Sequence, residues 1–331
     1  MKAKEHLTKF TKENPLPLSW SQLGVMETCN FKWYLDYVMK YRKHTRIFSE
    51  ATTRFGTNFH KYVEDGYQDI MLVDNEVDMF GEIDRKTPIP DEYIEGLYFV
   101  EDWMQKSWNE AQREGNHFGF IQPWRVEWEV WSPPQEVEIY ANEENMNHWS
   151  FKKDDNHPEL GECDCKKIDS VWIRRMGFVD IVFRLPDGSL YLWDIKTGKS
   201  SEFGKRKALG QLYYYKSIAE SLGYKVYGIG VIFPLDKLLV KREDRKVRRD
   251  EENISKLSER SQESVEKLVK KSLATIVTED ISADFKHYYC VEWCPYADSD
   301  LLLCNFEKHQ DLERFVPVEN LDELMELTVI Q

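Results

Sequence analysis

Two aspartates and a lysine stand in an otherwise apolar stretch, "GFVDIVFRLPDGSLYLWDIKTGK" at 177–199. The stretch predicts a hairpin that turns at its Pro-Asp-Gly, with Asp180 in one arm and Asp194 and Lys196 in the other. Acids and lysines are rarely buried in a sheet unless something pairs them. A turn at Asp-Gly sets Asp180 nearly opposite Asp194, about 5 Å away across the strands. Alternation puts Lys196 on the same face as Asp194.

Two carboxylates so close repel each other, and a cation between them relieves the repulsion. Hard oxygen ligands suit Mg²⁺ or Mn²⁺. Lys196 beside such an ion would position or deprotonate a water molecule, or stabilise charge on a phosphate. These groups together supply what metal-assisted phosphodiester hydrolysis requires, although an isolated Asp-x-Lys is more often a solvated ion pair without a function.

The rest of the chain must form a fold that holds this hairpin. Its 331 residues are 41% hydrophobic and 14% aromatic, which allows a sizeable core. Helical patterns come first, then three strands, a helix, a strand and a helix, an order that favours an α/β domain with a central mixed sheet flanked by helices. We expect an N-terminal helical region at 1–125 and a core at 126–235 with an insertion at about 135–170. A C-terminal helix and a cysteine-containing tail at 236–331 would pack back on the N-terminal region.

The formal net charge of −14 argues against a general polyanion binder. It does not exclude an enzyme that acts on nucleic acid, because the local potential matters more than the total. Basic residues crowd both ends of the hairpin, namely Arg174, Arg175, Lys199, Lys205, Arg206 and Lys207. The sequence has no signal-peptide pattern and no apolar run of membrane-spanning length. The predicted location is therefore the cytoplasm, or the host cytoplasm if the source is viral.

Four motifs in this order resemble the RecB-type branch of the PD-(D/E)XK nuclease superfamily, which includes AddB-type and CRISPR adaptation nucleases. They are a Gly-x-x-x-His that ends at His60, "GFVD" ending at Asp180, "DIK" at 194–196 and "QLYYY" at 211–215. The segment "SWSQLGVMETCNFKWYLDYV" is similar to the N-terminal Ser-x-Ser…Cys segment of the family. The resemblance runs from Ser19 to Cys304 outside the insertion, and it implies a restriction-endonuclease-like core.

The resemblance also implies roles for the residues of the hairpin. His60, Asp180 and Asp194 would bind the metal ion. The backbone carbonyl of Ile195 would assist them, and Lys196 would be the catalytic lysine.

Two further elements complete the implied site. Gln211 and Tyr215 lie four residues apart on one side of a helix and would hold the scissile phosphate or the attacking water. The family often adds a glutamate from the preceding strand, where Glu127 and Glu129 share a face and both fit. Glu129 is the ligand we take here, and the choice between the two stays open.

Four cysteines resemble those that hold a [4Fe–4S] cluster in relatives, with Cys29 near the start and Cys290, Cys294 and Cys304 in the tail. Such a cluster would clip distant parts of the chain together. The spacings depart from the usual Cys-x-x-Cys and short gap, since they are Cys-x-x-x-Cys and a gap of nine residues. Zinc ligation and plain burial of unligated cysteines therefore stay open as alternatives.

The resemblance implies a divalent-metal-dependent DNA nuclease, most closely an exonuclease that hydrolyses phosphodiester bonds at DNA ends or in single-stranded DNA. Such an enzyme would serve recombination, repair, replication or phage DNA processing, with a helicase or a recombination or replication protein as partner. Two alternatives stay open. One is a non-catalytic DNA-binding or assembly subunit that retains the nuclease fold, and the other is a structure-specific endonuclease or resolvase.

Overall fold

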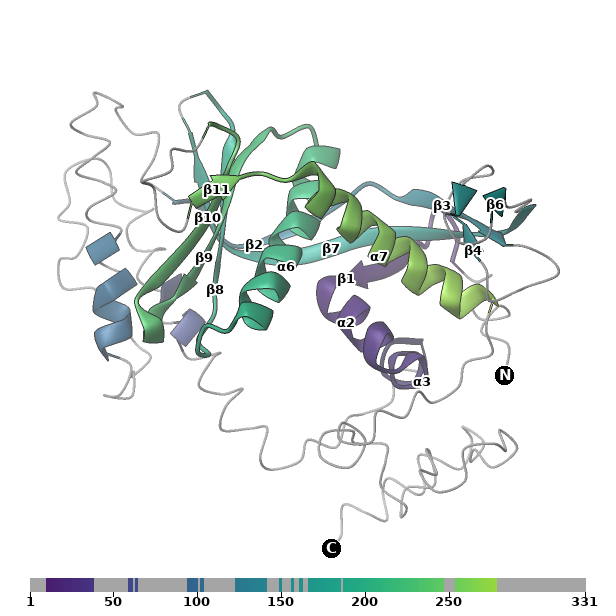
Figure 1. Ribbon diagram of the computed structural model, residues 1–331, viewed down its shortest axis with the longest axis horizontal. Coiled ribbons are helices and arrows are strands. Elements are labelled where there is room, and N and C mark those ends of the chain that lie inside the picture. The colour runs from purple at the N-terminus through teal and green to yellow at the C-terminus, as the bar shows by residue number, and fades with distance from the viewer. Residues whose placement is uncertain are drawn as a thin grey trace, which may run out of the picture. The chain divides into compact units, whose positions relative to one another are not determined.

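The computed structural model describes twelve stretches of the chain, which are 10–38, 59–61, 63–64, 94–100, 102–103, 123–141, 149–150, 156–157, 161–162, 166–185, 187–246 and 254–278. Figure 1 draws these stretches as a coloured ribbon. They belong to two compact units. The hairpin unit consists of residues 51–133 and 174–266, and the terminal unit of residues 1–50, 134–173 and 267–331. The three regions predicted from the sequence remain a prediction.

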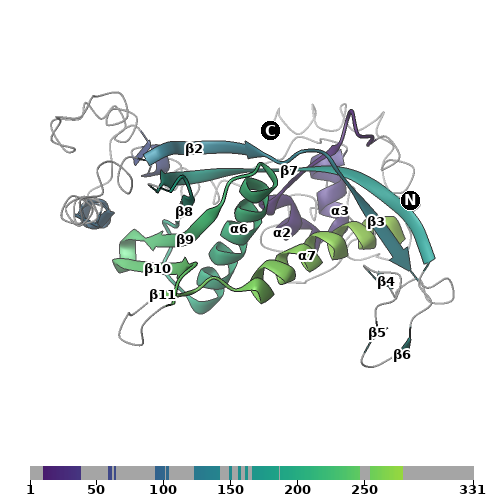
Figure 2. The same ribbon diagram turned by 90° about the horizontal axis from the view of Figure 1, so that it is seen from above.

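The sheet of the hairpin unit is mixed, as the sequence predicts. Its strands are β2 (Pro123–Trp131), β7 (Lys166–Arg184, of which 174–184 lie in this unit), β8 (Leu190–Ile195), β9 (Val226–Phe233), β10 (Leu238–Glu243) and β11 (Ile254–Lys256), in that spatial order. The pairs β2–β7, β7–β8 and β9–β10 are antiparallel, whereas β8–β9 and β10–β11 are parallel. The two views of the ribbon show β2 running along β7 (Figure 2).

The hairpin turns where the sequence predicts. The N–H of Gly188 donates to the carbonyl of Leu185, and the N–H of Leu185 donates to the carbonyl of Ser189, both at 2.8 Å. Gly188 has a φ of 82°, a left-handed conformation that glycine adopts without steric cost. The carboxylate of Asp187 accepts the N–H of Ser189 at 3.0 Å, and this fixes the register of the two arms.

One long helix, α6 (Glu202–Ser221), covers one face of this sheet. It begins at Ser201, whose hydroxyl accepts the N–H of Gly204 at 3.0 Å, and it ends before Gly223, which has a left-handed φ of 88°. A 3₁₀ turn (Pro234–Asp236) joins β9 to β10, and α7 (Glu259–Thr278) begins in this unit. The capping residues explain why the sequence alone predicts α6.

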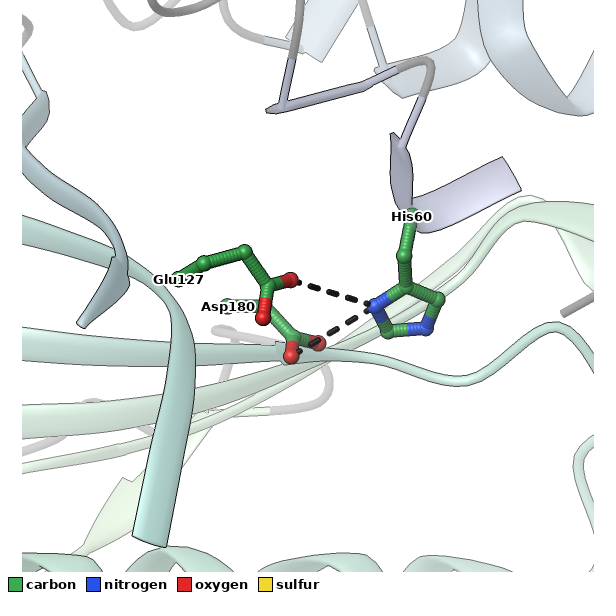
Figure 3. Close-up of side chains that lie close together, drawn as sticks. All are labelled: His60, Glu127 and Asp180. Atoms are coloured by element: carbon green, nitrogen blue, oxygen red, sulfur yellow. Dashed lines mark ion pairs between the residues drawn. The ribbon is translucent and has the colours of Figure 1, made fainter. Parts of the chain in front are cut away.

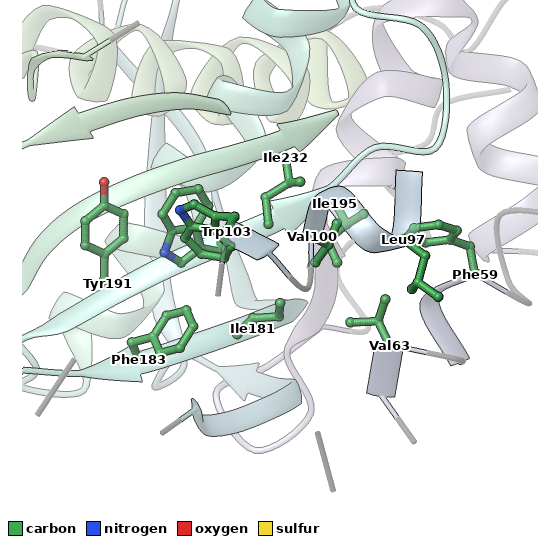
Figure 4. Packing of buried hydrophobic residues seen from close by; sticks show 11 residues of the cluster. Phe59, Val63, Leu97, Val100, Trp103, Ile181, Phe183, Tyr191, Ile195 and Ile232 are labelled. Carbon is green, nitrogen blue, oxygen red and sulfur yellow. The ribbon is translucent and has the colours of Figure 1, made fainter. Parts of the chain in front are cut away.

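The opposite face of the sheet packs on helical residues at 59–61, 63–64, 94–100 and 102–103. Alternate residues of β7 and β8 point to this side and form one apolar cluster (Figure 4). Its members are Phe59, Val63, Leu97, Val100, Trp103, Ile181, Phe183, Tyr191, Trp193, Ile195 and Ile232. All six residues of β8 are buried, because both faces of the sheet are covered.

The terminal unit has a separate set of elements. Its helices are α2 (Trp20–Thr28), α3 (Asn30–Trp33) and a π-helix (Tyr34–Val38), which follow the strand β1 (Leu16–Ser19). Ser19 caps α2 by accepting the N–H of Gln22 at 3.3 Å. Strand β3 (Gln135–Ala141) pairs with β4 (Trp149–Ser150) and with the first part of β7, and β5 (Asn156–His157) pairs with β6 (Gly161–Glu162). The segment that the sequence predicts as an insertion thus contains β3 and the start of β7.

The described helices are all too short or too polar to traverse a lipid bilayer.

Candidate active site

The candidate site lies where strands β7 and β8 part. Their last ladder pair is Ile181 with Trp193, and the same register sets Asp180 opposite Asp194 at the next position. The ladder stops there, and the N–H of Ile195 donates to Oδ2 of Asp180 at 2.5 Å. The carboxylate of Asp180 thus accepts the backbone N–H that has no partner in the β7–β8 ladder. We call the point where β7 and β8 separate, at Asp180 and Asp194, the fork.

Three side chains from three different elements converge at this fork (Figure 3). Nδ1 of His60, on the helical residues 59–61, lies 3.5 Å from Oδ1 of Asp180 and 3.7 Å from Oε1 of Glu127 on β2. One ligand atom from each of the three residues lies within 4.8 Å of the others. An imidazole nitrogen and two carboxylate oxygens at this spacing suit a single divalent cation.

Glu127 reaches the group through an unusual backbone conformation. Its φ is 46°, in the left-handed region, which costs a non-glycine residue roughly 1–2 kcal/mol. The neighbours Val126 and Trp128 keep their register with β7, so Glu127 lies opposite Asp180. Backbone strain of this kind persists where the surroundings enforce it, and it is concentrated at functional sites.

Glu129, the ligand taken in the sequence analysis, lies elsewhere. It is exposed, and its Oε1 accepts the indole N–H of Trp131 at 2.9 Å. The structure brings Glu127 rather than Glu129 to His60 and Asp180. A regular strand would place both glutamates on one face, and the left-handed residue breaks that alternation.

Asp194 stands beside this group with one oxygen unsatisfied. It is buried, with 1% of its surface exposed, and its Oδ1 accepts a hydrogen bond from Nζ of Lys196 at 3.0 Å. The other oxygen, Oδ2, is 2.8 Å from the same ammonium group, but it has no properly directed hydrogen bond in the described part of the chain. Burial raises the pKa of Asp194, an effect that the charge of Lys196 opposes. A buried lone pair without a donor is the kind of group that a cation satisfies.

The negative charge at the fork also changes the pKa of His60. Burial by itself would lower the pKa of His60, but the nearby negative charges of Asp180, Glu127 and Asp194 raise it to about 10, with Asp180 contributing most. The protonated imidazole is thus, together with the ammonium group of Lys196, a cation that balances the carboxylates. A divalent ion would replace that proton, because a histidine binds metal in its neutral form.

Lys196 is held by two acceptors and linked to a helix. Its ammonium group donates to Asp194 and, at 3.0 Å, to Oε1 of Gln211 on α6. The amide nitrogen of Gln211 in turn donates to the hydroxyl of Tyr215 at 2.7 Å, one helical turn further on. The side chains from the hairpin and from α6 therefore form one hydrogen-bonded chain.

Tyr215 explains the glycine that begins the "GFVD" motif. A Cβ atom at Gly177 would lie only 2.1 Å from Cε1 of Tyr215, so the phenol ring lies against the bare backbone of β7. This contact sets the distance between α6 and the strand that carries Asp180. Sequence analysis identifies Gly177 only as part of a motif, since its partner is 38 residues away (215 − 177).

The match with known proteins now decides the family. The model of the PD-(D/E)XK nuclease superfamily matches residues 17–299 of this chain. The chain belongs to the PD-(D/E)XK nuclease superfamily. No curated protein matches it closely enough to count as a relative.

Membership of the PD-(D/E)XK superfamily indicates a metal-dependent nuclease and a divalent ion such as Mg²⁺ or Mn²⁺. The donors at the fork fit such an ion. His60, Glu127 and Asp180 offer one ligand atom each, and the unsatisfied oxygen of Asp194 is beside them. The mixed sheet with helices on both faces agrees with the restriction-endonuclease-like core of the superfamily.

One of the basic residues that the sequence places at the hairpin is not available to a nucleic acid. Arg175 is buried, and its guanidinium group makes a two-pronged ion pair with Glu266 of α7, both contacts at 2.6 Å. It also donates to the hydroxyl of Ser217 at 3.0 Å. Its role is therefore to hold β7, α6 and α7 together rather than to contact a phosphate backbone.

The cysteines of the predicted cluster lie mostly outside the described residues. Cys29 is buried at the end of α2, and its sulfur accepts the N–H of Lys32 at 3.4 Å. Cys290, Cys294 and Cys304 lie outside the described stretches. The [4Fe–4S] cluster stays a prediction.

Proposed function

We propose that this protein is a divalent-metal-dependent DNA nuclease of the RecB-type branch, and an exonuclease that acts on DNA ends or single-stranded DNA. The observation that carries the proposal is the convergence of His60, Glu127 and Asp180 beside the buried pair of Asp194 and Lys196. Acidic ligands and a fixed ammonium group at one point are the parts that phosphodiester hydrolysis needs.

The ion would be held by His60, Glu127 and Asp180, with Asp194 and the carbonyl of Ile195 completing the set. When bound, it supplies positive charge to the phosphate and lowers the pKa of a water molecule. The chain's own carboxylates orient that set before substrate arrives, because Asp180 is fixed by the N–H of Ile195. Such preorganisation is a main source of rate enhancement in enzymes.

Lys196 would stabilise the charge that develops on the phosphate. An ammonium group has three donors. Two of them are engaged by Asp194 and Gln211, which leaves one direction for a phosphate oxygen or a water molecule. Gln211 and Tyr215 act as positioning residues, because each is fixed by the next member of the hydrogen-bonded chain.

The choice of an exonuclease follows the resemblance to RecB-type and AddB-type enzymes, as does a place in recombination, repair, replication or phage DNA processing with a helicase as partner. End-labelled linear DNA and closed circular DNA, incubated separately with Mg²⁺ or Mn²⁺, test it. We expect the linear substrate to lose its label and the circle to survive. Cutting of the circle would indicate an endonuclease instead. A linear substrate that stays intact both with Mg²⁺ and with Mn²⁺ would contradict the proposal.

A further inference from the structure

A cluster of aromatic rings lies on β2 next to the acidic fork. Trp124 and Trp128, on either side of Glu127, have ring centroids 5.6 Å apart. Tyr224, which follows α6, lies 5.5 Å from Trp124 and 5.8 Å from Trp128. We call these three rings, two indoles and one phenol, the indole platform. All three are partly exposed, so the platform is not simply part of the core.

Two arginines lie over the same ring of the platform. The guanidinium carbon of Arg125 is 4.9 Å from the ring centre of Trp124, and that of Arg184 on β7 is 5.8 Å away. Both arginines are exposed. Within the described stretches neither of them forms an ion pair with a carboxylate. The chain has 59 acidic residues, yet both of these cations are without an acidic partner in the part of the chain that the structure describes.

Arginine on an indole ring has a specific chemistry. The ring holds the planar guanidinium group in one orientation, while its outer face remains open. One N–H of Arg125 donates to the carbonyl of Trp124 at 3.4 Å, and the other N–H groups remain for a ligand. A nucleobase stacks on that outer face, and a phosphate oxygen accepts from its edge. Lysine offers a point charge and no such plane.

The ligand class follows from this geometry. Base faces in a duplex are already covered by the neighbouring base pairs, whereas a single strand exposes them to aromatic and guanidinium planes. We propose that the indole platform, with Arg125 and Arg184, binds single-stranded nucleic acid and delivers it to the fork. This inference rests on the proposed function for what happens at the fork, but the binding itself does not.

The register of β2 and β7 places the two arginines on one side of the fork. Glu127 lies opposite Asp180, and Arg125 pairs with Val182 further along the same ladder. Arg184 is four residues beyond Asp180, which at the usual strand rise is about 13 Å. A strand bound on these arginines therefore has only a few nucleotides to cross before its backbone meets the acidic group.

The test measures binding without cleavage. Fluorescence anisotropy follows a short labelled oligothymidylate and a blunt duplex of equal length, both with EDTA present so that no divalent ion is available. The variants are Arg184→Ala, Arg184→Lys, the double variant Arg125→Ala/Arg184→Ala, and Arg260→Ala as a control. Arg260 is an exposed arginine on α7 that contacts no aromatic ring of the described residues, so its removal changes the charge alone. Thermal melting checks that each variant is folded.

We expect Arg184→Ala to weaken oligothymidylate binding roughly fivefold and the double variant roughly tenfold or more. Arg184→Lys should restore less than half of the loss, because it returns the charge without the plane. Arg260→Ala should change binding less than about twofold, and no variant should affect the duplex more than Arg260→Ala does. A double variant that binds oligothymidylate as well as Arg260→Ala overturns the inference.

The result is independent of the cleavage assay. If these arginines are needed for oligothymidylate binding and the protein cuts no DNA, the binding inference holds and the proposed nuclease function fails. If the protein cuts DNA but the arginine variants bind as the control does, the nuclease proposal holds and this inference fails.

Discussion

Two groups of charges in the hairpin unit, each built around a buried side chain, differ in one respect. At the fork, three carboxylates crowd one imidazole, and Oδ2 of Asp194 has no directed hydrogen bond in the described stretches. Around Arg175, by contrast, the guanidinium group meets both oxygens of Glu266 and the hydroxyl of Ser217. The second group is satisfied within the fold and serves structure. The first is incomplete, and an incomplete buried group needs a ligand from outside.

The largest effect should be on the rate of DNA cleavage, and it should come from removing the ammonium group of Lys196. Lys196→Ala should lower the rate of DNA cleavage roughly 10²–10³-fold, the usual loss when one preorganised donor is removed from an active site. The thermal midpoint should change little by comparison. Single-turnover cleavage of end-labelled DNA measures the rate. Lys216→Ala removes a lysine of α6 that is paired with Glu220, and its rate should match the original protein.

The ion pair between Arg175 and Glu266 should affect the stability of the fold rather than the rate of cleavage. Glu266→Ala takes away the carboxylate that accepts both hydrogen bonds from one side of the buried guanidinium group of Arg175, and we expect the free energy of unfolding to fall by about 3 kcal/mol. The double change Arg175→Met/Glu266→Leu should recover much of this loss, because it leaves no unpaired charge. Urea denaturation gives the values. A single variant as stable as the original protein would show that this pair does not hold the unit together.

The next largest effect on stability should come from disturbing the contact between α6 and β7. Gly177→Ala puts a methyl group into the ring of Tyr215, so the free energy of unfolding should fall by about 1–3 kcal/mol. Gly198→Ala is the matched control, since nothing lies within 4 Å of a Cβ atom there. Equal denaturation midpoints for the two variants would contradict the close approach of the phenol ring to the strand.

Relief of the backbone strain at Glu127 should give the smallest change in the free energy of unfolding. The change should be a gain in stability, whereas Glu266→Ala and Gly177→Ala lose stability. Glu127→Gly removes a side chain from a left-handed conformation, so the free energy of unfolding should rise by about 1 kcal/mol while DNA cleavage falls. A gain in stability together with a loss of activity is the signature of strain retained for function. Loss of both would indicate that Glu127 contributes to the fold instead.

Local signals account for what the sequence predicts correctly. The Asp-Gly turn, the serine cap of α6 and the alternation of apolar residues fix the hairpin and the helix, so the register of Asp180 against Asp194 follows from short stretches. The mixed sheet flanked by helices follows from the order of these elements. His60 is predicted only through a family motif, because nothing in the sequence around it indicates a partner 120 residues away (180 − 60).

Other features depend on contacts that no local pattern records. The choice of Glu127 over Glu129 turns on one left-handed residue, a conformation that the sequence does not encode when the residue is not glycine. The burial of Arg175 depends on Glu266, which is 91 residues away. A basic residue beside a hairpin looks the same in the sequence whether it faces solvent or a carboxylate.

Titration of Mn²⁺ by calorimetry tests the central claim, that the fork is a metal site built on Glu127. The original protein and Glu129→Gln should bind the ion with the same affinity, while Glu127→Gln should bind it at least roughly tenfold more weakly, since it removes one charged ligand from the set. If the two glutamine variants bind Mn²⁺ equally well, or if the original protein binds none, the fork is not the metal site described here.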